Sequence, residues 1–367
     1  MEKPVIRIAF VDSWLGFDPE HNFITDALRL HFTPQIVEAE PDFVFYSCFG
    51  LQHLRFPHAV KIFYTGENIE PDFNQCDFAI TPSRISFGIR HLYLPVYALS
   101  YESDLKPELP PVTPELAKRK FCSFIYSNDR VGEGSRCRAA FCRKLMDSYA
   151  HVDCPARVLH NMDAPELARR GDAANWNSSK ISFLGQYKFN IAYENSSNNG
   201  YITEKLMDCY LGNTVPIYRG SEGELGEDIP RESLICAHDY PTEEALIARI
   251  REVNENDELY LAMLAANPLR HGLSLDFRPL VGAFLKRAIE RGTTPYDKDI
   301  WSFGDAARLS RLHGRVGGAR FLLHNLGLGL RSLFARGEKR KQLKEQRRLS
   351  KYAVKDIREL QRLRIPD

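Results

Sequence analysis

One segment, residues 187–220, constrains the fold of this 367-residue chain more than any other. Residues 188–193 alternate and are rich in aromatic and β-branched side chains, a pattern typical of a half-buried strand. A polar loop follows, then a helical pattern over 203–211 and a short apolar strand over 214–218. The segment therefore predicts a βαβ unit. Its loop opens at the carboxyl end of a parallel strand, which is the edge where such sheets bind ligands.

The first turn of the predicted helix carries Glu204 and Lys205, after a possible cap at Thr203. Free N–H groups and the positive end of the helix dipole favour an anion there, and the lysine adds a full charge. Lysine suits a phosphate, and a carboxylate beside it suits the diol of a ribose. An ordinary surface helix with a solvated Glu and Lys has the same spacing, so the pattern alone leaves both interpretations open.

The sequence of this segment also resembles, nearly residue for residue, the donor-binding motif of the α1,3/4-fucosyltransferases of glycosyltransferase family 10, including the bacterial enzymes of the Lewis-antigen type. The matching strings are Tyr-Lys-Phe-Asn at 187–190, Tyr-Glu-Asn-Ser at 193–196, Tyr-Ile-Thr-Glu-Lys at 201–205 and Val-Pro-Ile at 215–217. The resemblance runs from about residue 60 to 270. It implies an α/β fold of the GT-B architecture, in which two Rossmann-like domains face each other across a cleft.

The length of the chain suggests two domains, and 44% hydrophobic residues can fill two cores. Residues 1–105 alternate apolar strands with helical patterns and predict a first Rossmann-like domain, which by resemblance would hold the acceptor. Clustered prolines indicate a linker over 106–118. Residues 119–300 would then form the donor-binding domain, and residues 301–367 a helical, basic tail.

The formal net charge of the chain is +1, which argues against nucleic acid as a partner. Residues 1–4 lead directly into an apolar strand, so no signal peptide is expected, and no apolar run is long enough to span a membrane. The eight cysteines lack the paired spacing of metal ligands and suit buried thiols in a reducing compartment. We therefore expect a cytoplasmic protein. The sequence does not indicate its oligomeric state.

A second informative stretch is Thr65-Gly66-Glu67-Asn68. A strand ends just before it, and the glycine permits a sharp turn that presents Glu67 at the carboxyl edge of the sheet, where a carboxylate can act as a general base. From its residues alone, Glu67 is more simply a turn glutamate in water. The stretch is similar to a Gly-Glu-Asn motif of bacterial family members, which implies that Glu67 is the base and Asn68 a neighbouring site residue. Asn68 equally suits a turn cap.

A glycine-rich loop, residues 132–134, leads into a predicted helix that carries Arg136 and Arg138. Free N–H groups at the start of a helix attract an anion, and a guanidinium group can bind phosphate through two hydrogen bonds. The family frame Arg-x-x-Phe-x-x-x-Leu selects Arg138 as the diphosphate contact. Arg136 stays a candidate, and solvated side chains fit the pattern too.

The resemblance implies the other site residues and the reaction. Glu204 would bind the ribose hydroxyls, Asn195 and Tyr201 the diphosphate or the sugar, Lys205 the phosphates, and Glu194 would line the same loop. The implied reaction is the inverting transfer of L-fucose from GDP-β-L-fucose to a hydroxyl of an N-acetylglucosamine-containing glycan such as N-acetyllactosamine. An α1,3 linkage would give a Lewis x-like product on lipopolysaccharide or another surface glycan.

Two other functions fit the sequence: a GT-B transferase for another nucleotide sugar, and an inactive, membrane-tethered relative that binds glycans. No Asp-x-Asp metal motif lies near the candidate residues, and cationic side chains can do the electrostatic work of a metal. We therefore expect no metal site and no required cofactor, although a divalent cation could still stimulate the reaction.

The last part of the chain departs from the family pattern. Residues 320–335 are apolar but interrupted by glycines, and residues 336–367 carry twelve Lys/Arg against five Asp/Glu. An apolar segment beside such a basic run predicts peripheral contact of residues 320–367 with anionic lipid on the inner face of the membrane. A solvated or coiled-coil helix fits the same sequence equally well.

Overall fold

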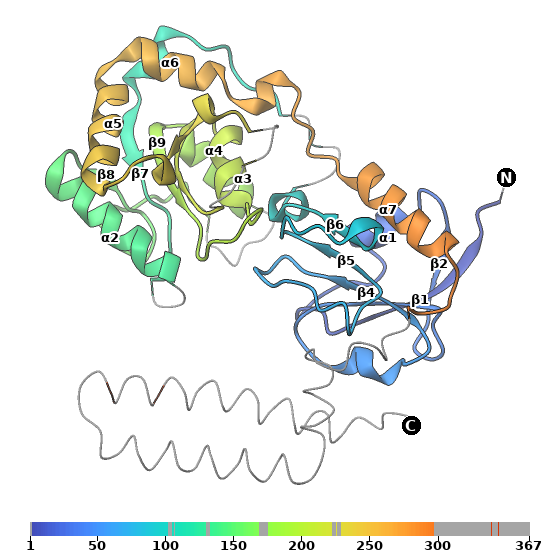
Figure 1. Cartoon of the computed structure of the whole chain (residues 1–367). Helices are drawn as coiled ribbons and strands as arrows, with labels where there is room; N and C mark the ends of the chain where they lie inside the picture. The colour runs from blue at the N-terminus through green and yellow to red at the C-terminus, as the bar shows by residue number, and fades with distance from the viewer. Residues whose placement is uncertain are drawn as a thin grey trace.

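The computed structural model describes residues 2–101, 105, 107–129, 133–168, 175–221, 225, 229–296, 339 and 344. Within them the chain forms two parallel β-sheets with helices, and the two sheets lie in separate halves of the molecule (Figure 1). The predicted α/β class is therefore confirmed. The predicted tail, apart from residues 339 and 344, lies outside the described residues, as does nearly all of its proposed membrane segment. None of the described helices is long and apolar enough to cross a bilayer.

The first sheet has six parallel strands in the order β2-β1-β3-β4-β5-β6. They are β1 (Val5–Val11), β2 (Thr33–Ile36), β3 (Phe43–Tyr46), β4 (Val60–Tyr64), β5 (Phe78–Thr81) and β6 (His91–Tyr93). The three strands β3, β4 and β5 are buried along their whole length, as parallel strands covered on both faces must be. Helix α1 (Phe23–Leu28) covers part of one face and is capped by Asn22, whose side chain accepts hydrogen bonds from two backbone N–H groups of its first turn.

Helix α7 (Arg278–Glu290) packs against α1 and completes the first core, far from its neighbours in sequence (Figure 1). Its buried residues include Phe284, whose ring meets the ring of Phe78 edge-on at 6.1 Å. The prediction that residues 119–300 form one domain is therefore wrong at its C-terminal end. The physical reason is that α1, with six residues, cannot cover the apolar face of a six-stranded sheet, and α7 supplies the missing cover.

The second sheet has five parallel strands in the order β11-β10-β9-β7-β8. They are β7 (Lys120–Ser123), β8 (Val152–Asp153), β9 (Tyr187–Tyr193), β10 (Val215–Arg219) and β11 (Ile235–Cys236). The helices are α2 (Glu133–Ser148), α3 (Trp176–Leu184), α4 (Glu204–Leu211), α5 (Glu243–Glu255) and α6 (Asp257–Ala265). Short 3₁₀ helices cover Gln52–Arg55, Gly88–Arg90, Val96–Leu99, Pro114–Lys118, Arg231–Ser233, Ala237–Asp239 and Pro268–His271.

The predicted βαβ unit is confirmed as β9, α4 and β10. Thr203 caps α4, since its side chain accepts a hydrogen bond from the backbone N–H of Lys205. Every residue of β9 is buried, because it is the central strand of the sheet and pairs with both β10 and β7. The unit thus places the loop of residues 194–203, called the donor loop below, at the carboxyl edge of the central strand.

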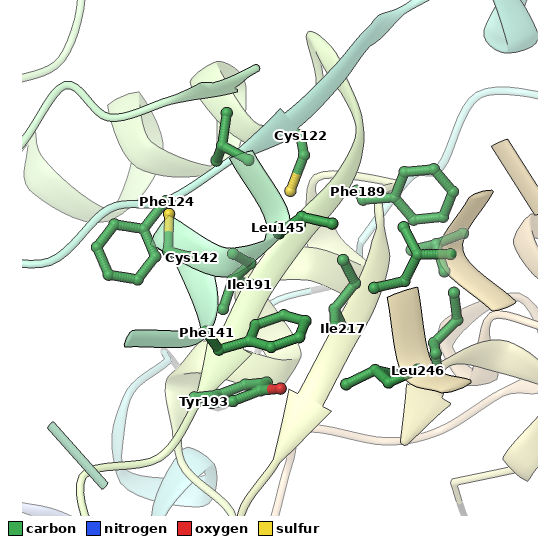
Figure 2. Close-up of a cluster of buried hydrophobic side chains, with 14 of the residues drawn as sticks. Cys122, Phe124, Phe141, Cys142, Leu145, Phe189, Ile191, Tyr193, Ile217 and Leu246 are labelled. Atoms are coloured by element: carbon green, nitrogen blue, oxygen red, sulfur yellow. The ribbon is translucent and has the colours of Figure 1, made fainter. Parts of the chain in front are cut away.

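The core of the second half fixes α2 against β9. Figure 2 shows the rings of Phe141 on α2 and Tyr193 on β9 face to face, with centroids 5.1 Å apart. This packing brings the start of α2 up to the donor loop. A Cβ atom on Gly134 would lie only 2.5 Å from the carbonyl oxygen of Glu194, so no larger residue fits there without a shift of the backbone. The first turn of α2 therefore lies against the backbone that follows the carboxyl end of β9.

The two halves of the molecule meet at the donor loop. The backbone N–H of Arg84 donates to the carbonyl of Asn199 at 2.9 Å, and the hydroxyl of Tyr93 donates to the carbonyl of Gly200 at 3.0 Å. Gly200 has a φ of 94°, and a Cβ there would come within 2.7 Å of the Tyr93 ring. The first domain therefore holds the loop closely at a point where only glycine fits.

Candidate active site

A cavity of about 170 Å³ lies at the carboxyl edge of the second sheet. The ends of β7 and β9 and the first turn of α4 meet at its walls, together with side chains of α2 and α3. Its lining residues are Ile125, Tyr126, Ser127, Asn128, Arg138, Trp176, Lys180, Asn190, Asn195, Glu204 and Lys205. Three of these side chains are cationic and one is anionic, so the walls favour an anionic ligand.

Lys205 is the centre of an ionic cluster at this cavity. Its Nζ lies 3.1 Å from Oε2 of Glu194 and 3.2 Å from Oε1 of Glu204, and it donates to Oγ1 of Thr203 at 2.8 Å. Burial alone would lower the pKa of Lys205, but the two carboxylates outweigh that effect and raise this pKa. The ammonium group is therefore held charged, in a fixed position, at neutral pH.

Glu194 is the buried member of that cluster and contacts both Lys205 and Thr203. Its side chain is completely buried, and its carboxylate accepts hydrogen bonds from the backbone N–H of Thr203 at 2.9 Å and from the Thr203 hydroxyl at 2.7 Å. Burial raises the pKa of Glu194, and Lys205 acts in the opposite direction. Glu194 does not line the Lys205 cavity but a neighbouring one of about 330 Å³. Glu194 is therefore suited to a positioning role, because it holds both the capping residue Thr203 and Lys205.

Glu204 lines the cavity with a carboxylate that stays ionised. Burial alone would raise the pKa of Glu204, but the ammonium groups of Lys205 and Lys180 lower it to about 2. A carboxylate held in this state accepts hydrogen bonds and donates none, which suits the two hydroxyl groups of a ribose. The geometry is thus compatible with the predicted role of Glu204.

Lys180 on α3 is a cationic wall residue that the sequence reasoning missed. Its Nζ lies 2.5 Å from Oδ2 of Asp208, whose Oδ1 accepts a hydrogen bond from the hydroxyl of Tyr101 at 2.7 Å. Asp208 follows Glu204 by one turn on α4, and it is buried. An acidic residue on the buried stripe of a helix needs a partner, so Asp208 was the available signal for a buried cation.

The structure separates the two candidate arginines. Arg138 is buried and lines the cavity; its guanidinium group lies 3.9 Å from the centre of the Tyr126 ring and donates to the carbonyl of Asn128 at 2.6 Å. Arg136 is exposed and is not among the lining residues. The geometry therefore favours Arg138, the residue that the family frame selects.

Asn195 and Tyr201 take different places on the donor loop. Asn195 is half-buried and lines the cavity. Tyr201 is buried and is not among the lining residues, so its predicted direct contact with the donor has no support from this geometry. Burial raises the pKa of Tyr201, and the negative charges of Glu194 and Glu67 add to that rise.

Glu67 and Asn68 lie on the first-domain side of the same loop. Glu67 is exposed in the turn after β4, and its backbone N–H donates to Oγ1 of Thr65 at 2.9 Å. The next side chain crosses to the second domain, because Nδ2 of Asn68 donates to Oγ of Ser196 at 2.9 Å. The structure thus brings the turn that carries Glu67 to the border of the donor loop.

Over the part of the chain that the structure describes, no three His, Cys, Asp or Glu side chains are grouped so that they could hold a metal ion. None of the eight cysteines forms a disulfide bond within the described residues, and six of them are buried.

Two family models match this chain in succession. The model of the α-(1,3)-fucosyltransferase FucT N-terminal domain matches residues 8–100, and the C-terminal model of glycosyltransferase family 10 (fucosyltransferase) matches residues 116–265. The chain belongs to glycosyltransferase family 10, the α1,3-fucosyltransferases. The resemblance to this family, first seen in the donor motif, is thereby confirmed for both domains.

Curated relatives and solved structures agree with this family. The chain is 29% identical to the α-(1,3)-fucosyltransferase FucT of Helicobacter pylori, over 80% of this chain and 68% of that protein. It is 30% identical to the putative fucosyltransferase R654 of Acanthamoeba polyphaga mimivirus, over 40% of this chain but only 24% of that protein. A crystal structure of an α1,3-fucosyltransferase with GDP-fucose superposes with a TM-score of 0.62 at 25% identity, covering 81% of this chain and 94% of that one. The GT-B architecture of this family member is therefore confirmed.

Proposed function

We propose that the chain transfers L-fucose from GDP-β-L-fucose to a hydroxyl group of an N-acetylglucosamine-containing glycan, with inversion and with an α1,3 linkage. The observation that carries the proposal is the cationic cavity beside the donor loop, with Lys205 fixed by Glu194 and with Glu67 at the loop's other border. The similarity to a crystallised α1,3-fucosyltransferase with GDP-fucose supports the choice of donor.

The cationic wall suits the leaving group. As the bond between the fucose C1 and the phosphate oxygen breaks, negative charge grows on the GDP diphosphate. Lys205, Arg138 and the positive end of the α4 dipole can stabilise that charge without any rearrangement. The carboxylate of Glu204 accepts hydrogen bonds from the ribose hydroxyls, and Trp176 adds apolar surface to the same cavity.

Glu67 supplies the base on the acceptor side. The acceptor oxygen attacks C1 from the face opposite to the phosphate and forms the new C–O bond, while its proton passes to the Glu67 carboxylate. One displacement converts the β-linked donor into an α-linked product. An exposed carboxylate suits this role, because it is ionised before the reaction and exchanges its proton with water afterwards.

Arg138→Ala is expected to weaken GDP binding about tenfold or more, because a hydrogen bond to a charged group is worth about 1.5–3 kcal/mol. Arg136→Ala, two residues away on the same helix, is the matched control and should bind GDP as the wild type does. Isothermal titration calorimetry with GDP measures both dissociation constants. Equal losses in the two variants, or a loss confined to Arg136→Ala, would contradict the assignment.

The proposal includes transfer without a divalent cation. Treatment with excess EDTA is expected to leave the rate of fucose transfer unchanged, because the charge of the leaving group is met by side chains. The measurement is product formation before and after EDTA, with added Mn²⁺ or Mg²⁺ as the control. Loss of activity that returns on addition of either ion would show that a metal is needed.

The acceptor and the cellular place of the reaction complete the proposal. The proposed acceptors are N-acetyllactosamine-type chains, giving a Lewis x-like product on lipopolysaccharide or another surface glycan, as the resemblance of the donor motif to bacterial enzymes of the Lewis-antigen type implies. A cytoplasmic enzyme, held at the inner face of the membrane by residues 320–367, follows from the apolar and basic composition of that segment.

A panel of radiolabelled donors tests the proposal. Incubation with N-acetyllactosamine and GDP-fucose, GDP-mannose, UDP-galactose or UDP-N-acetylglucosamine should give product from GDP-fucose alone, and analysis of that product identifies the linkage. Turnover of another donor would favour a different nucleotide-sugar transferase. Binding of glycan without turnover of any donor would favour an inactive relative.

A further inference from the structure

Large apolar side chains are exposed along the carboxyl edge of the first sheet. Trp14 is 42% exposed, Phe49 is 50% exposed and Ile69 is 42% exposed. They follow β1, β3 and β4, which are neighbouring parallel strands, so their loops leave the sheet at the same edge. Several large apolar side chains gathered at one edge favour a binding surface over chance exposure.

A buried hydrogen bond between Asp12 and His53 ties two of these loops together. The carboxylate of Asp12 lies 2.7 Å from Nδ1 of His53 and accepts hydrogen bonds from the backbone N–H groups of Gln52 and His53, and both side chains are at most 3% exposed. Asp12 has a φ of 56°, a conformation that few residues other than glycine adopt. The carbonyl of Asp12 also accepts from the backbone N–H of Phe49 at 3.1 Å. The loops after β1 and β3 therefore form one fixed unit.

That unit lies against the turn of the proposed base. The Trp14 ring meets the ring of Tyr64, the last residue of β4, with centroids 6.3 Å apart. In the loop that carries the exposed phenylalanine, Sγ of Cys48 lies 3.5 Å from Oγ1 of Thr65. Oγ1 of Thr65 also accepts a hydrogen bond from the backbone N–H of Glu67. Both loops are thus in direct contact with the segment that presents the carboxylate.

The chemistry of this surface matches a sugar ring. A pyranose has a flat face of C–H groups and an edge of hydroxyls, and flat aromatic side chains suit the first while a carboxylate suits the second. We propose that Trp14 and Phe49 form the platform on which the acceptor sugar lies, with its reactive hydroxyl directed to Glu67. The Asp12–His53 pair positions the platform. This inference rests on the proposed fucosyltransferase function and adds the residues that hold its acceptor.

The experiment compares Trp14→Ala, Phe49→Ala and Trp14→Phe with the wild type, using the full chain, GDP-fucose and four acceptor probes: N-acetyllactosamine, lacto-N-biose, lactose and N-acetylglucosamine. With the acceptor that the wild type uses best, each alanine variant should raise the acceptor KM about tenfold. The KM for GDP-fucose and the slow hydrolysis of GDP-fucose without acceptor should stay unchanged. Trp14→Phe keeps a flat ring and should restore most of the loss.

Val5→Ala is the matched control. Val5 is 65% exposed at the opposite end of β1, away from the carboxyl edge, and its variant should have wild-type values of both KM constants. Wild-type transfer with an unchanged acceptor KM in both alanine variants overturns this inference alone. A KM for GDP-fucose that rises in parallel also overturns it, since the loss would then be structural. A wild type that fucosylates none of the four sugars overturns the proposed function and this inference with it.

Discussion

The Glu67→Gln protein is expected to transfer fucose at least about a hundredfold more slowly than the wild type, with unchanged affinity for GDP-fucose. General base catalysis contributes roughly 10²–10⁴-fold in enzymes, and an amide of the same shape cannot take the proton of the acceptor hydroxyl. Glu67 is exposed and is not among the residues that line the donor cavity, so its replacement should leave the fold and the donor site intact.

Two measurements separate catalysis from binding in this variant. Initial rates of product formation at saturating acceptor give kcat, and calorimetry with GDP-fucose gives the donor dissociation constant. Glu70→Gln is the control, because Glu70 is an exposed carboxylate three residues further along the same segment. A Glu67→Gln protein with a wild-type kcat would remove Glu67 from the mechanism. A loss of equal size in Glu70→Gln would point to the local charge and away from a specific base.

The donor site could be predicted from the sequence because its parts are local. Thr203, Glu204 and Lys205 belong to one helix start, and a cap, a dipole and two charges can be recognised within a few residues. The helical periodicity of the sequence also distinguishes Arg136 from Arg138. Two residues apart on a helix means about 200° of rotation, and Arg138 shares its face with the buried stripe of α2.

Long-range partners could not be predicted in the same way. The apolar stripe of α7 shows that the helix is buried, but a stripe does not specify which of two sheets it covers, and the sheet nearer in sequence was the wrong choice. Lys180 meets Asp208 only because α3 and α4 pack together. The border between Glu67 and the donor loop likewise depends on the contact of two domains, as the Asn68–Ser196 hydrogen bond illustrates.

The Lys205→Met protein is expected to suffer two separate losses. Binding of GDP-fucose should fall at least about tenfold, because the cavity loses a fixed ammonium group. The free energy of unfolding should fall by about 3–5 kcal/mol, since removal of one partner leaves the buried Glu194 carboxylate without its counter-charge. Calorimetry with GDP-fucose measures the first loss, and urea denaturation measures the second.

The stability loss should depend on pH in a direction that the structure fixes. Burial already raises the pKa of Glu194, and Lys205 opposes that rise, so the pKa in the folded variant should rise further. The folded state then binds more protons than the unfolded state, in which a glutamate titrates near about 4.3. The free energy of unfolding of Lys205→Met, relative to the wild type, should therefore decrease as the pH rises from the pKa of Glu194 in the folded wild type to its higher pKa in the folded variant.

The double variant Glu194→Gln with Lys205→Met separates the two losses. Without a buried charge on either side, it should recover much of the stability and lose the added pH dependence, because a neutral amide can still accept the hydrogen bonds of Thr203. Donor binding should not recover, since the ammonium group is still absent. A double variant that binds GDP-fucose like the wild type would mean that Lys205 acts only by neutralising Glu194, and the electrostatic account of the leaving group would fail.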